Sequence, residues 1–506
     1  MITLSIVPEI AAVPAAWKIL SLSTLVHLTC FGWVFQHIMR NRRDPVSAML
    51  WILVTWSVPL FGFAAYLSFG VNRVAAKSWQ KESANRRLAS ERSAREAEAL
   101  PLNYWRSIRE AVAHEPTHPV AQKIDHAIAG QLTDSPLLAG NHIELLVTGD
   151  EAFPAMLEAI ASARHHIHVQ SFIIGHDDVG HRLMEALKTA ATRGVSVRVL
   201  YDRFGSTRAV VGGFFHRHRG IPNLRLAGWT MANLFKRQFQ INLRNHRKVM
   251  IVDGCIAFTG GINLHEENLT RGDLAPIRDY HVRVRGPVVS ELQYTFLRDW
   301  YYITDENPDR LLSAEHFPPL QAEGEAPIRV VNGGPATELD EIYDSLFACL
   351  VSARERIIAV TPYFVPTSDI VRALRHAALR GVEVRLVVPR DNNHIYAGWA
   401  GRAYYEELLE AGVRIFERQP PFMHAKGLII DEAVAVIGTA NLDVRSLKLN
   451  YETNLMVYDA PFINRLMRTM LEEVALSQEI DLNLWHQRPL TQRMRENACS
   501  ILTPIL

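Results

Sequence analysis

The sequence predicts an α/β protein in which two duplicated domains build one shared site, preceded by an N-terminal transmembrane helical hairpin. Three observations lead to this prediction. Two long apolar segments lie near the N-terminus, patterns typical of helix and strand alternate through the rest of the chain, and the second half repeats residues of the first roughly 180 residues later. A length of 506 residues suits two to four domains, and 48% of apolar residues suffices for a large core.

Residues 1–70 are predicted to form the hairpin. The segments 19–39 and 48–70 are each long enough, as helices, to cross a hydrocarbon layer of about 30 Å, and the second carries no charged residue. A short polar loop joins them, so both ends of the hairpin would lie on one side of the membrane. A pair of buried helices in a soluble protein is the alternative. The positive-inside rule leans towards a cytoplasmic catalytic part, although basic residues flank both sides. Residues 71–142 are predicted to be a helical connector.

The remaining chain contains an internal duplication. Ser-Ala-Arg stands at 162–164 and again at 352–354, each time followed by an apolar, strand-like run. Arg-Gly-Val stands at 193–195 and at 380–382, where a glycine ends a helical pattern and alternating valines begin a strand. The predicted boundaries are a first domain at 143–305, a linker at 306–327, a second domain at 328–485 and an amphipathic C-terminal segment at 486–506.

Each copy contains the same polar residues at the same spacing. A lysine follows a histidine by two residues, an aspartate follows it by seven, and an asparagine follows it by seventeen. A lone His-x-Lys occurs by chance in many proteins, whereas two matched sets are specific. The sets are His246, Lys248, Asp253 and Asn263 in the first copy, and His424, Lys426, Asp431 and Asn441 in the second. We predict that the two sets meet in one catalytic site.

The chemistry of these side chains indicates phosphate. Residues two apart on a strand face the same way, so the histidine and lysine of each copy would share a site. Two ammoniums and two amides suit the non-bridging oxygens of a phosphate, and two imidazoles suit a nucleophile and a general acid. The aspartates, at odd spacing, are expected to act within the motifs as local anchors.

Two further carboxylates are candidates for orienting the histidines. Asp279 and Glu452 lie downstream of the two sets at comparable places, each before an alternating, strand-like run. No acidic cluster typical of a metal site accompanies the sets, so neither a metal nor another cofactor is expected.

The paired sets are similar to the HKD motifs of the phospholipase D superfamily. Residues 361–366, 398–402 and 441–447, together with 45–51 and 59–70, resemble segments of bacterial cardiolipin synthases. The resemblance implies that each domain is a mixed sheet flanked by helices. It also implies that His246 attacks one phosphatidylglycerol at phosphorus and releases glycerol, after which a second phosphatidylglycerol attacks the phosphohistidine to give cardiolipin. His424 would be the acid and later the base, while the lysines and asparagines would bind the phosphate oxygens. The symmetry of the duplication leaves the two histidine roles open.

Other functions remain as alternatives. A phospholipase D-type hydrolase would use the same residues with water as acceptor. A nuclease fits poorly with a net charge of +1, and the intact residue sets argue against an inactive membrane scaffold. The resemblance implies phosphatidylglycerol, cardiolipin and the lipid bilayer as partners, a bacterial inner-membrane location with two spans, and no nucleic acid. An oligomer is possible.

Two features of the composition are expected to carry no chemistry. The four cysteines are far apart and indicate neither a disulfide framework nor a zinc site. The tract His165-His166-Ile167-His168 resembles a metal-binding run but lacks a further ligand, so we expect it to begin a solvated strand.

Overall fold

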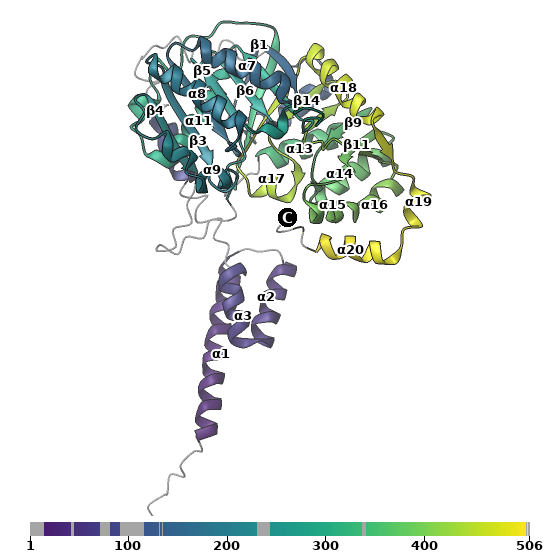
Figure 1. The fold of residues 1–506 in the computed structure, drawn as a ribbon. Helices are drawn as coiled ribbons and strands as arrows, with labels where there is room; N and C mark the ends of the chain where they lie inside the picture. The colour runs from purple at the N-terminus through teal and green to yellow at the C-terminus, as the bar shows by residue number, and fades with distance from the viewer. Residues whose placement is uncertain are drawn as a thin grey trace, which may run out of the picture. The chain divides into compact units, whose positions relative to one another are not determined.

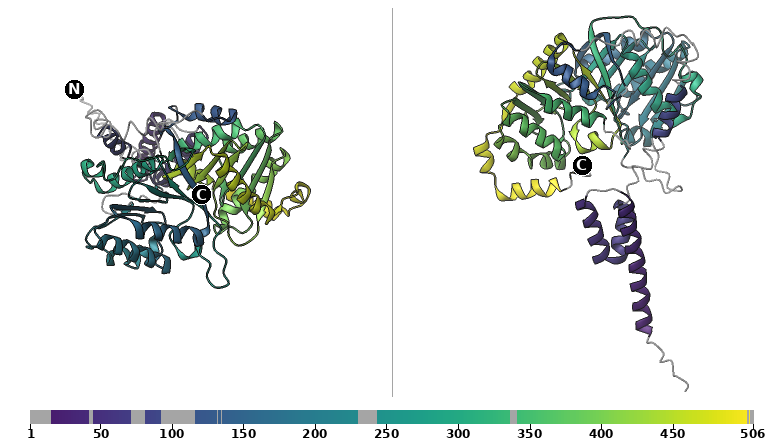
Figure 2. Two further views of the ribbon diagram at one scale, coloured as in Figure 1. Left: turned by 90° about the horizontal axis from the view of Figure 1, so that it is seen from above. Right: turned by 180° about the vertical axis from the view of Figure 1, so that it is seen from behind.

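The chain divides into two units, Met1–Ala76 and Lys77–Leu506. The computed structural model describes residues 15–41, 45–70, 81–91, 116–130, 132–133, 135–229, 243–335, 341–501 and 503. Within these residues the larger unit is built on one sheet of 15 strands. Its first half, blue and teal in Figures 1 and 2, lies beside its second half, green and yellow.

The strands of the two halves correspond one to one. The first half contributes β1 (Leu137–Val147), β2 (His166–Ser171), β3 (Ser196–Asp202), β4 (Leu224–Trp229), β5 (Val249–Val252), β6 (Ile256–Gly260) and β7 (Tyr280–Arg285). The second contributes β8 (Ala326–Gly333), β9 (Arg356–Val360), β11 (Glu383–Pro389), β12 (Arg414–Arg418), β13 (Gly427–Ile430), β14 (Val434–Gly438) and β16 (Glu452–Val457), with β17 (Ser477–Glu479) at its edge. A separate two-stranded sheet pairs β10 (Phe364–Val365) with β15 (Leu442–Asp443).

The order of the strands confirms the duplication and the mixed sheet. From the outer edge to the centre the first half runs β4-β3-β2-β5-β6-β7-β1, and the second runs β12-β11-β9-β13-β14-β16-β8. In each half the first three strands of this order are parallel and the others antiparallel, and in the second half β17 adds an antiparallel strand outside β12. Strands β1 and β8 pair antiparallel at the centre, with Leu137 opposite Arg329 and Leu138 opposite Ile328. One continuous sheet therefore fixes the two halves relative to each other.

Helices cover both faces of this sheet. Those of the first half are α6 (Pro119–Ile128), α7 (Thr148–Ser162), α8 (Asp178–Thr192), α9 (Thr207–Val211), α10 (Phe214–Arg217), the 3-10 turn η3 (Glu266–Asn268), α11 (Val289–Thr304) and α12 (Pro308–Leu311). Those of the second are α13 (Glu341–Ser352), α14 (Ser368–Leu379), α15 (Ile395–Arg402), α16 (Tyr405–Glu410), α17 (Val444–Lys448), α18 (Ala460–Ala475), α19 (Leu482–His486) and α20 (Leu490–Ser500). Helices α11 and α18 contribute to a central core shared by both halves. A second core lies within the first half, and a third joins α6 to the second half.

The repeated Arg-Gly-Val segments form the helix-to-strand turns predicted for them. Gly194 and Gly381 adopt φ of 97° and 88°, a conformation in which glycine carries no steric penalty. The next residue donates a backbone hydrogen bond back into the preceding helix, from Val195 to Ala190 at 3.2 Å and from Val382 to Ala377 at 3.1 Å. Each helix therefore ends where the sequence pattern placed its end, and strand β3 or β11 begins.

The smaller unit differs from the predicted hairpin of two long helices. It contains α1 (Ala15–Arg40), α2 (Pro45–Ser57), α3 (Pro59–Ala65) and the π-helix η1 (Tyr66–Gly70). The second predicted span, 48–70, is therefore two short helices. The rings of Trp51 and Tyr66 lie 5.4 Å apart, whereas fifteen residues of straight helix would separate them by about 22 Å. The chain thus reverses direction between α2 and α3.

Small and ring-bearing side chains hold this reversal together. Gly62 approaches the backbone of Val54 and Thr55 so closely that any Cβ would clash there. Tyr66 Oη lies 2.8 Å from His37 Nδ1 on α1, alongside which α2 and α3 pack (Figure 1). Among the residues that the structure describes, no helix combines the length and the apolar character needed to cross a membrane.

Helix α20 near the C-terminus has two different faces. On one face Cys499 is buried with Val365 and Ala400, and the Arg495 guanidinium lies 4.2 Å from the ring centre of Trp399. On the other face large apolar side chains reach solvent, among them Met494, which is 63% exposed. The helix therefore rests on α15 with one face and presents apolar side chains to solvent on the other.

Candidate active site

The two histidine motifs lie at the junction of the halves, where each is held by the other half. His246 donates its backbone N–H to Tyr451 O at 2.9 Å, and His424 donates to Arg278 O at 2.7 Å. These contacts are equivalent under the duplication, because the segment just before β16 holds the first motif and the segment just before β7 holds the second. Both histidines line a cleft of about 580 Å³, called here the catalytic cleft.

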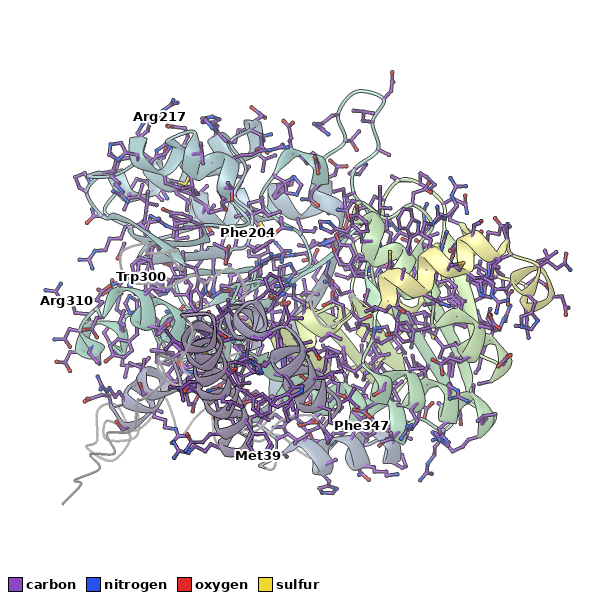
Figure 3. All side chains as sticks on the ribbon, turned by 90° about the horizontal axis from the view of Figure 1, so that it is seen from below. Met39, Phe204, Arg217, Trp300, Arg310 and Phe347 are labelled. Atoms are coloured by element: carbon purple, nitrogen blue, oxygen red, sulfur yellow. The ribbon has the colours of Figure 1, made fainter. Side chains whose placement is uncertain are left out.

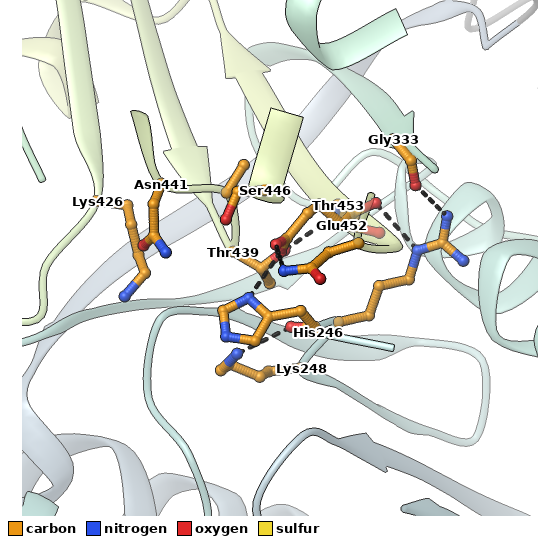
Figure 4. Close-up of polar contacts among 12 residues, drawn as sticks. His246, Lys248, Gly333, Lys426, Thr439, Asn441, Ser446, Glu452 and Thr453 are labelled. Atoms are coloured by element: carbon orange, nitrogen blue, oxygen red, sulfur yellow. Dashed lines mark hydrogen bonds and ion pairs between the residues drawn. The ribbon is translucent and has the colours of Figure 1, made fainter. Parts of the chain in front are cut away.

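Each histidine takes its orienting carboxylate from the opposite half. His246 Nδ1 lies 2.9 Å from Glu452 Oε2, and His424 Nδ1 lies 2.7 Å from Asp279 Oδ2. Both carboxylates are fully buried. A carboxylate at Nδ1 fixes the ring so that Nε2 is left for chemistry. The sequence indicated the right two carboxylates, but not that the pairs would be exchanged between the halves. Figure 4 shows the contact between His246 and Glu452.

One position beside these carboxylates differs between the copies. Thr439 donates its hydroxyl to Glu452 Oε2 at 2.5 Å and accepts the backbone N–H of Thr453 at 2.9 Å (Figure 4). Gly261 takes the equivalent place in the first copy, and any Cβ there would collide with the Asp279 carboxylate. The Thr439 hydroxyl therefore supports the carboxylate that orients His246.

The two lysines carry charges that are costly to bury. Lys248 Nζ donates to His246 O at 2.8 Å, and Lys426 Nζ lies 3.0 Å from His424 Nε2. Burial lowers the pKa of Lys248 to about 7 and that of Lys426 to about 8, against the opposing effect of the nearby carboxylates. An anion between them would offset this loss of solvation.

The histidines are neutral for the same reason. Burial lowers the pKa of His246, and burial together with the Lys426 charge lowers that of His424 to about 3. Their carboxylate partners stay ionised, since the nearby lysine charges and the hydrogen bonds from the histidines hold the pKa of Asp279 and of Glu452 below the usual value despite burial. A neutral imidazole beside a carboxylate is a suitable nucleophile.

The asparagines of both sets also line the catalytic cleft. Asn441 Nδ2 donates to Asp443 Oδ2 at 3.0 Å, and Asn263 Oδ1 accepts the backbone N–H of Ile173 at 3.3 Å. Each amide is thereby oriented at the end of β14 or β6, next to the histidines. The structure brings together all the predicted residues but two.

Asp253 and Asp431 lie away from the cleft. The Asp253 carboxylate accepts backbone N–H groups from residues 164, 165 and 166 at 2.7–2.9 Å. Asp431 accepts those of residues 354, 355 and 356 at 2.6–2.8 Å. Each aspartate therefore ties the turn after its motif strand to the start of a neighbouring strand. The prediction that Asp253 and Asp431 lie in the catalytic site is therefore wrong. The prediction that they anchor the backbone locally agrees with these hydrogen bonds.

A buried polar network behind the first motif was not anticipated. Asp299 on α11 accepts hydrogen bonds from Arg247 Nη1 at 2.7 Å, from Asn245 Nδ2 at 2.8 Å and from Gln170 Nε2 at 2.7 Å. Lys81 Nζ lies 2.6 Å from the same carboxylate. Arg247 also donates to the backbone oxygen of Glu452 at 3.0 Å. Arg247, the variable residue of His-x-Lys, thus links both halves. Polar residues such as Asp299 within the apolar pattern of α11 were the sequence feature that could have predicted this network.

The tract at 165–168 is not the solvated strand start that we expected. His166 and His168 are fully buried, and their rings pack 4.8 Å and 5.0 Å from that of His316. Arg198 Nη1 lies 3.2 Å from His168 Nε2 and 3.3 Å from His316 Nε2. Burial holds the pKa of all three histidines below the usual value. His166 and His168 form a neutral cluster because both pack against His316, and His168 also stacks on Phe296 of α11.

The site and the fold together define a phosphate-transfer enzyme with two histidines in one cleft. The family model described as "Cardiolipin synthase, PLD-like domain" matches residues 156–300 and 346–474, and the one described as "Phospholipase D-nuclease N-terminal" matches 28–70. A cardiolipin synthase of Geobacillus thermodenitrificans is 35% identical over 492 residues, which cover 96% of this chain and 93% of the relative. Cardiolipin synthase 2 of Bacillus anthracis is 35% identical over 477 residues, 93% of this chain and 88% of the relative.

A solved structure agrees on the fold. That of a phosphatidylserine synthase from Haemophilus influenzae matches with a TM-score of 0.59 at 14% identity, over 76% of this chain and 100% of the other. The chain belongs to the cardiolipin synthase family of the phospholipase D superfamily.

Proposed function

We propose that this protein transfers a phosphatidyl group between two phosphatidylglycerol molecules, giving cardiolipin and glycerol through a phosphohistidine. The observation that carries the proposal is the pair of exchanged histidine–carboxylate contacts, at 2.9 Å and 2.7 Å, beside two buried lysines in one cleft. Two neutral imidazoles whose Nδ1 atoms face carboxylates can use Nε2 to attack phosphorus and to move protons, while the ammoniums bind the phosphate oxygens.

In the first step we assign the attack to His246. Its Nε2 forms a bond to phosphorus, the bond from phosphorus to the glycerol oxygen breaks, and His424 gives a proton to that oxygen. Among the described residues, an ammonium lies within hydrogen-bonding distance of Nε2 only in His424, where Lys426 Nζ is 3.0 Å away. The Nε2 of His246 is therefore the less obstructed nucleophile.

In the second step the roles reverse. Neutral His424 takes the proton of a terminal hydroxyl on the second phosphatidylglycerol, the hydroxyl oxygen bonds to phosphorus, and the bond from phosphorus to nitrogen breaks. The phosphodiester brings a negative charge between the lysines, which opposes the lowering of the His424 pKa by Lys426. Substrate binding thus favours the protonated acid that the first step needs. Lys248, Lys426, Asn263 and Asn441 bind the phosphate oxygens, and the step requires no metal or other cofactor.

The N-terminal unit is proposed to anchor the enzyme in the bacterial inner membrane. The contact between Trp51 and Tyr66 supports an arrangement in which α2 and α3 enter and leave the bilayer by the same face, in place of a second full span. Exposed apolar residues near the cleft, Ile395 and Tyr396 at 56% and 62% exposed, would contact the lipid. No nucleic acid partner is proposed.

Cysteine labelling in membrane vesicles tests this arrangement. In a background without the native cysteines, Asn41→Cys and Lys77→Cys should react with a charged maleimide from the same side if α2 and α3 re-enter. Reaction from opposite sides would instead establish two full spans.

A product assay tests the activity. The purified full chain in detergent, given labelled phosphatidylglycerol and no added metal, should yield cardiolipin and glycerol. The variants His246→Ala and His424→Ala should yield neither, while His142→Ala, at an exposed position on β1, should match the wild type. Phosphatidic acid as the main product would indicate the hydrolase instead, and activity surviving both cleft substitutions would exclude the phosphohistidine.

A further inference from the structure

The catalytic centre is duplicated, but the rim of the cleft is not. Arg244 stands two residues before His246, where the second copy has Phe422 before His424. Arg445 stands four residues after Asn441, where the first copy has Glu267 after Asn263. All four rim residues line the catalytic cleft. One rim therefore carries two guanidiniums, and the rim related to it by the duplication carries a carboxylate and a ring.

The two arginines face the cleft together. Burial, followed by the charge of Arg445, lowers the pKa of Arg244 to about 10. The Arg244 guanidinium lies 3.9 Å from the ring centre of Phe204, which is 52% exposed and lies toward the middle of the molecule seen from below (Figure 3). Arg244 Nε is buried without a hydrogen-bond partner among the described residues. Asp202 near Arg244 and Asp443 near Arg445 oppose part of the repulsion between the two arginines, and an anion bound in the cleft would oppose it further.

The equivalent rim has the opposite character. Backbone contacts bring its residues together, since Ile277 donates to Glu267 O at 2.8 Å and the adjacent Arg278 donates to Phe422 O at 3.0 Å. A carboxylate and an apolar ring disfavour an anion. The cleft can thus hold one phosphate at its symmetric centre and a second one only on the arginine side.

We propose that Arg244 and Arg445 bind the phosphodiester of the acceptor lipid. This inference rests on the proposed function and specifies its second substrate. The donor phosphate occupies the centre between the lysines. An acceptor phosphatidylglycerol brings its own phosphate, joined to the attacking hydroxyl by a three-carbon bridge, so a second anion must lie close beside the first. Guanidinium forks suit phosphate oxygens, and water as an acceptor would need no such pair.

Competition between two acceptors tests the proposal. The full chain in detergent is given labelled phosphatidylglycerol together with butan-1-ol, which accepts a phosphatidyl group but carries no phosphate. Cardiolipin and phosphatidylbutanol are measured for the wild type, Arg244→Gln, Arg445→Gln and the double variant. Arg271→Gln, which alters an exposed arginine paired with Glu266 at 2.8 Å, is the matched control.

The double variant should lower the ratio of cardiolipin to phosphatidylbutanol at least tenfold, with phosphatidylbutanol formation retained. Retained butanol transfer also demonstrates that the variant is folded. If the variants make cardiolipin at an unchanged ratio to phosphatidylbutanol, the arginine assignment is overturned and the proposed function stands. An equal loss of both products also overturns the assignment, because it would mean that the arginines bind the donor lipid. A wild type that makes no cardiolipin overturns the proposed function and this inference together.

Discussion

Replacing Glu452 with glutamine should slow the first chemical step strongly, although Glu452 lies in the half opposite to His246. As Nε2 bonds to phosphorus the ring becomes positively charged, and Glu452 Oε2, 2.9 Å from Nδ1, stabilises that charge. Glutamine keeps a similar shape and one acceptor but removes the negative charge. Unit charges about 4 Å apart at an effective dielectric constant of about 20 interact by about 4 kcal/mol. The rate of phosphohistidine formation should therefore fall about a thousandfold.

Rapid-quench measurement of glycerol release from labelled phosphatidylglycerol checks this value. Glu452→Gln should lose the initial burst, and Asp279→Asn, which affects His424 as the acid of the first step and the base of the second, should slow both the burst and steady turnover. Glu306→Gln is the matched control, because Glu306 is a carboxylate paired with Arg198 at 2.8 Å outside the cleft. A loss below tenfold in Glu452→Gln would refute the proposed role of the exchanged carboxylate.

Three further predictions concern other parts of the molecule. Gly261→Ala should displace the Asp279 carboxylate and reduce kcat at least a hundredfold without unfolding the protein. Steady-state kinetics and circular dichroism together check this, and a normal kcat would contradict the close approach of Gly261 to Asp279. Asp431→Ala removes three hydrogen bonds to backbone N–H groups and should lower the free energy of unfolding by about 3 kcal/mol. Urea titration measures that loss, and kcat per folded molecule should stay near the wild type. His166 and His168 have a lower pKa in the folded than in the unfolded protein. Their contribution to the free energy of unfolding is therefore complete above pH 6.5 and is lost as the pH falls below it. From pH 8 to pH 5 the melting temperature should fall less steeply for His168→Phe than for the wild type. Equal slopes would contradict the prediction that this histidine must be neutral in the folded protein.

The duplication and the catalytic residues were predictable because they depend on spacing along the chain. The turns at Gly194 and Gly381 follow from local backbone geometry, and two equal spacings after His246 and His424 required no knowledge of the fold. The odd spacing of Asp253 also predicted its anchoring contact, since a residue at the end of a strand faces away from the site.

Contacts between distant segments were not predictable in the same way. The exchange of Glu452 and Asp279 depends on how β1 and β8 join the halves, which no local pattern records. Reversal at Ser57–Pro59 was missed because hydropathy measures apolar length and not direction. The burial of His168 depends likewise on packing against residues far along the chain.

The exchanged carboxylates also bear on how this gene could have evolved. A single ancestral half would contain a histidine without its carboxylate partner, so activity would have required two copies to associate. Fusion of two such copies would place both histidine–carboxylate pairs within one polypeptide. Thereafter each copy could diverge at the rim, as Arg244 and Phe422 have done, but not at Glu452 or Asp279 without disabling its neighbour. Separately expressed halves should therefore be inactive alone and complement each other when mixed.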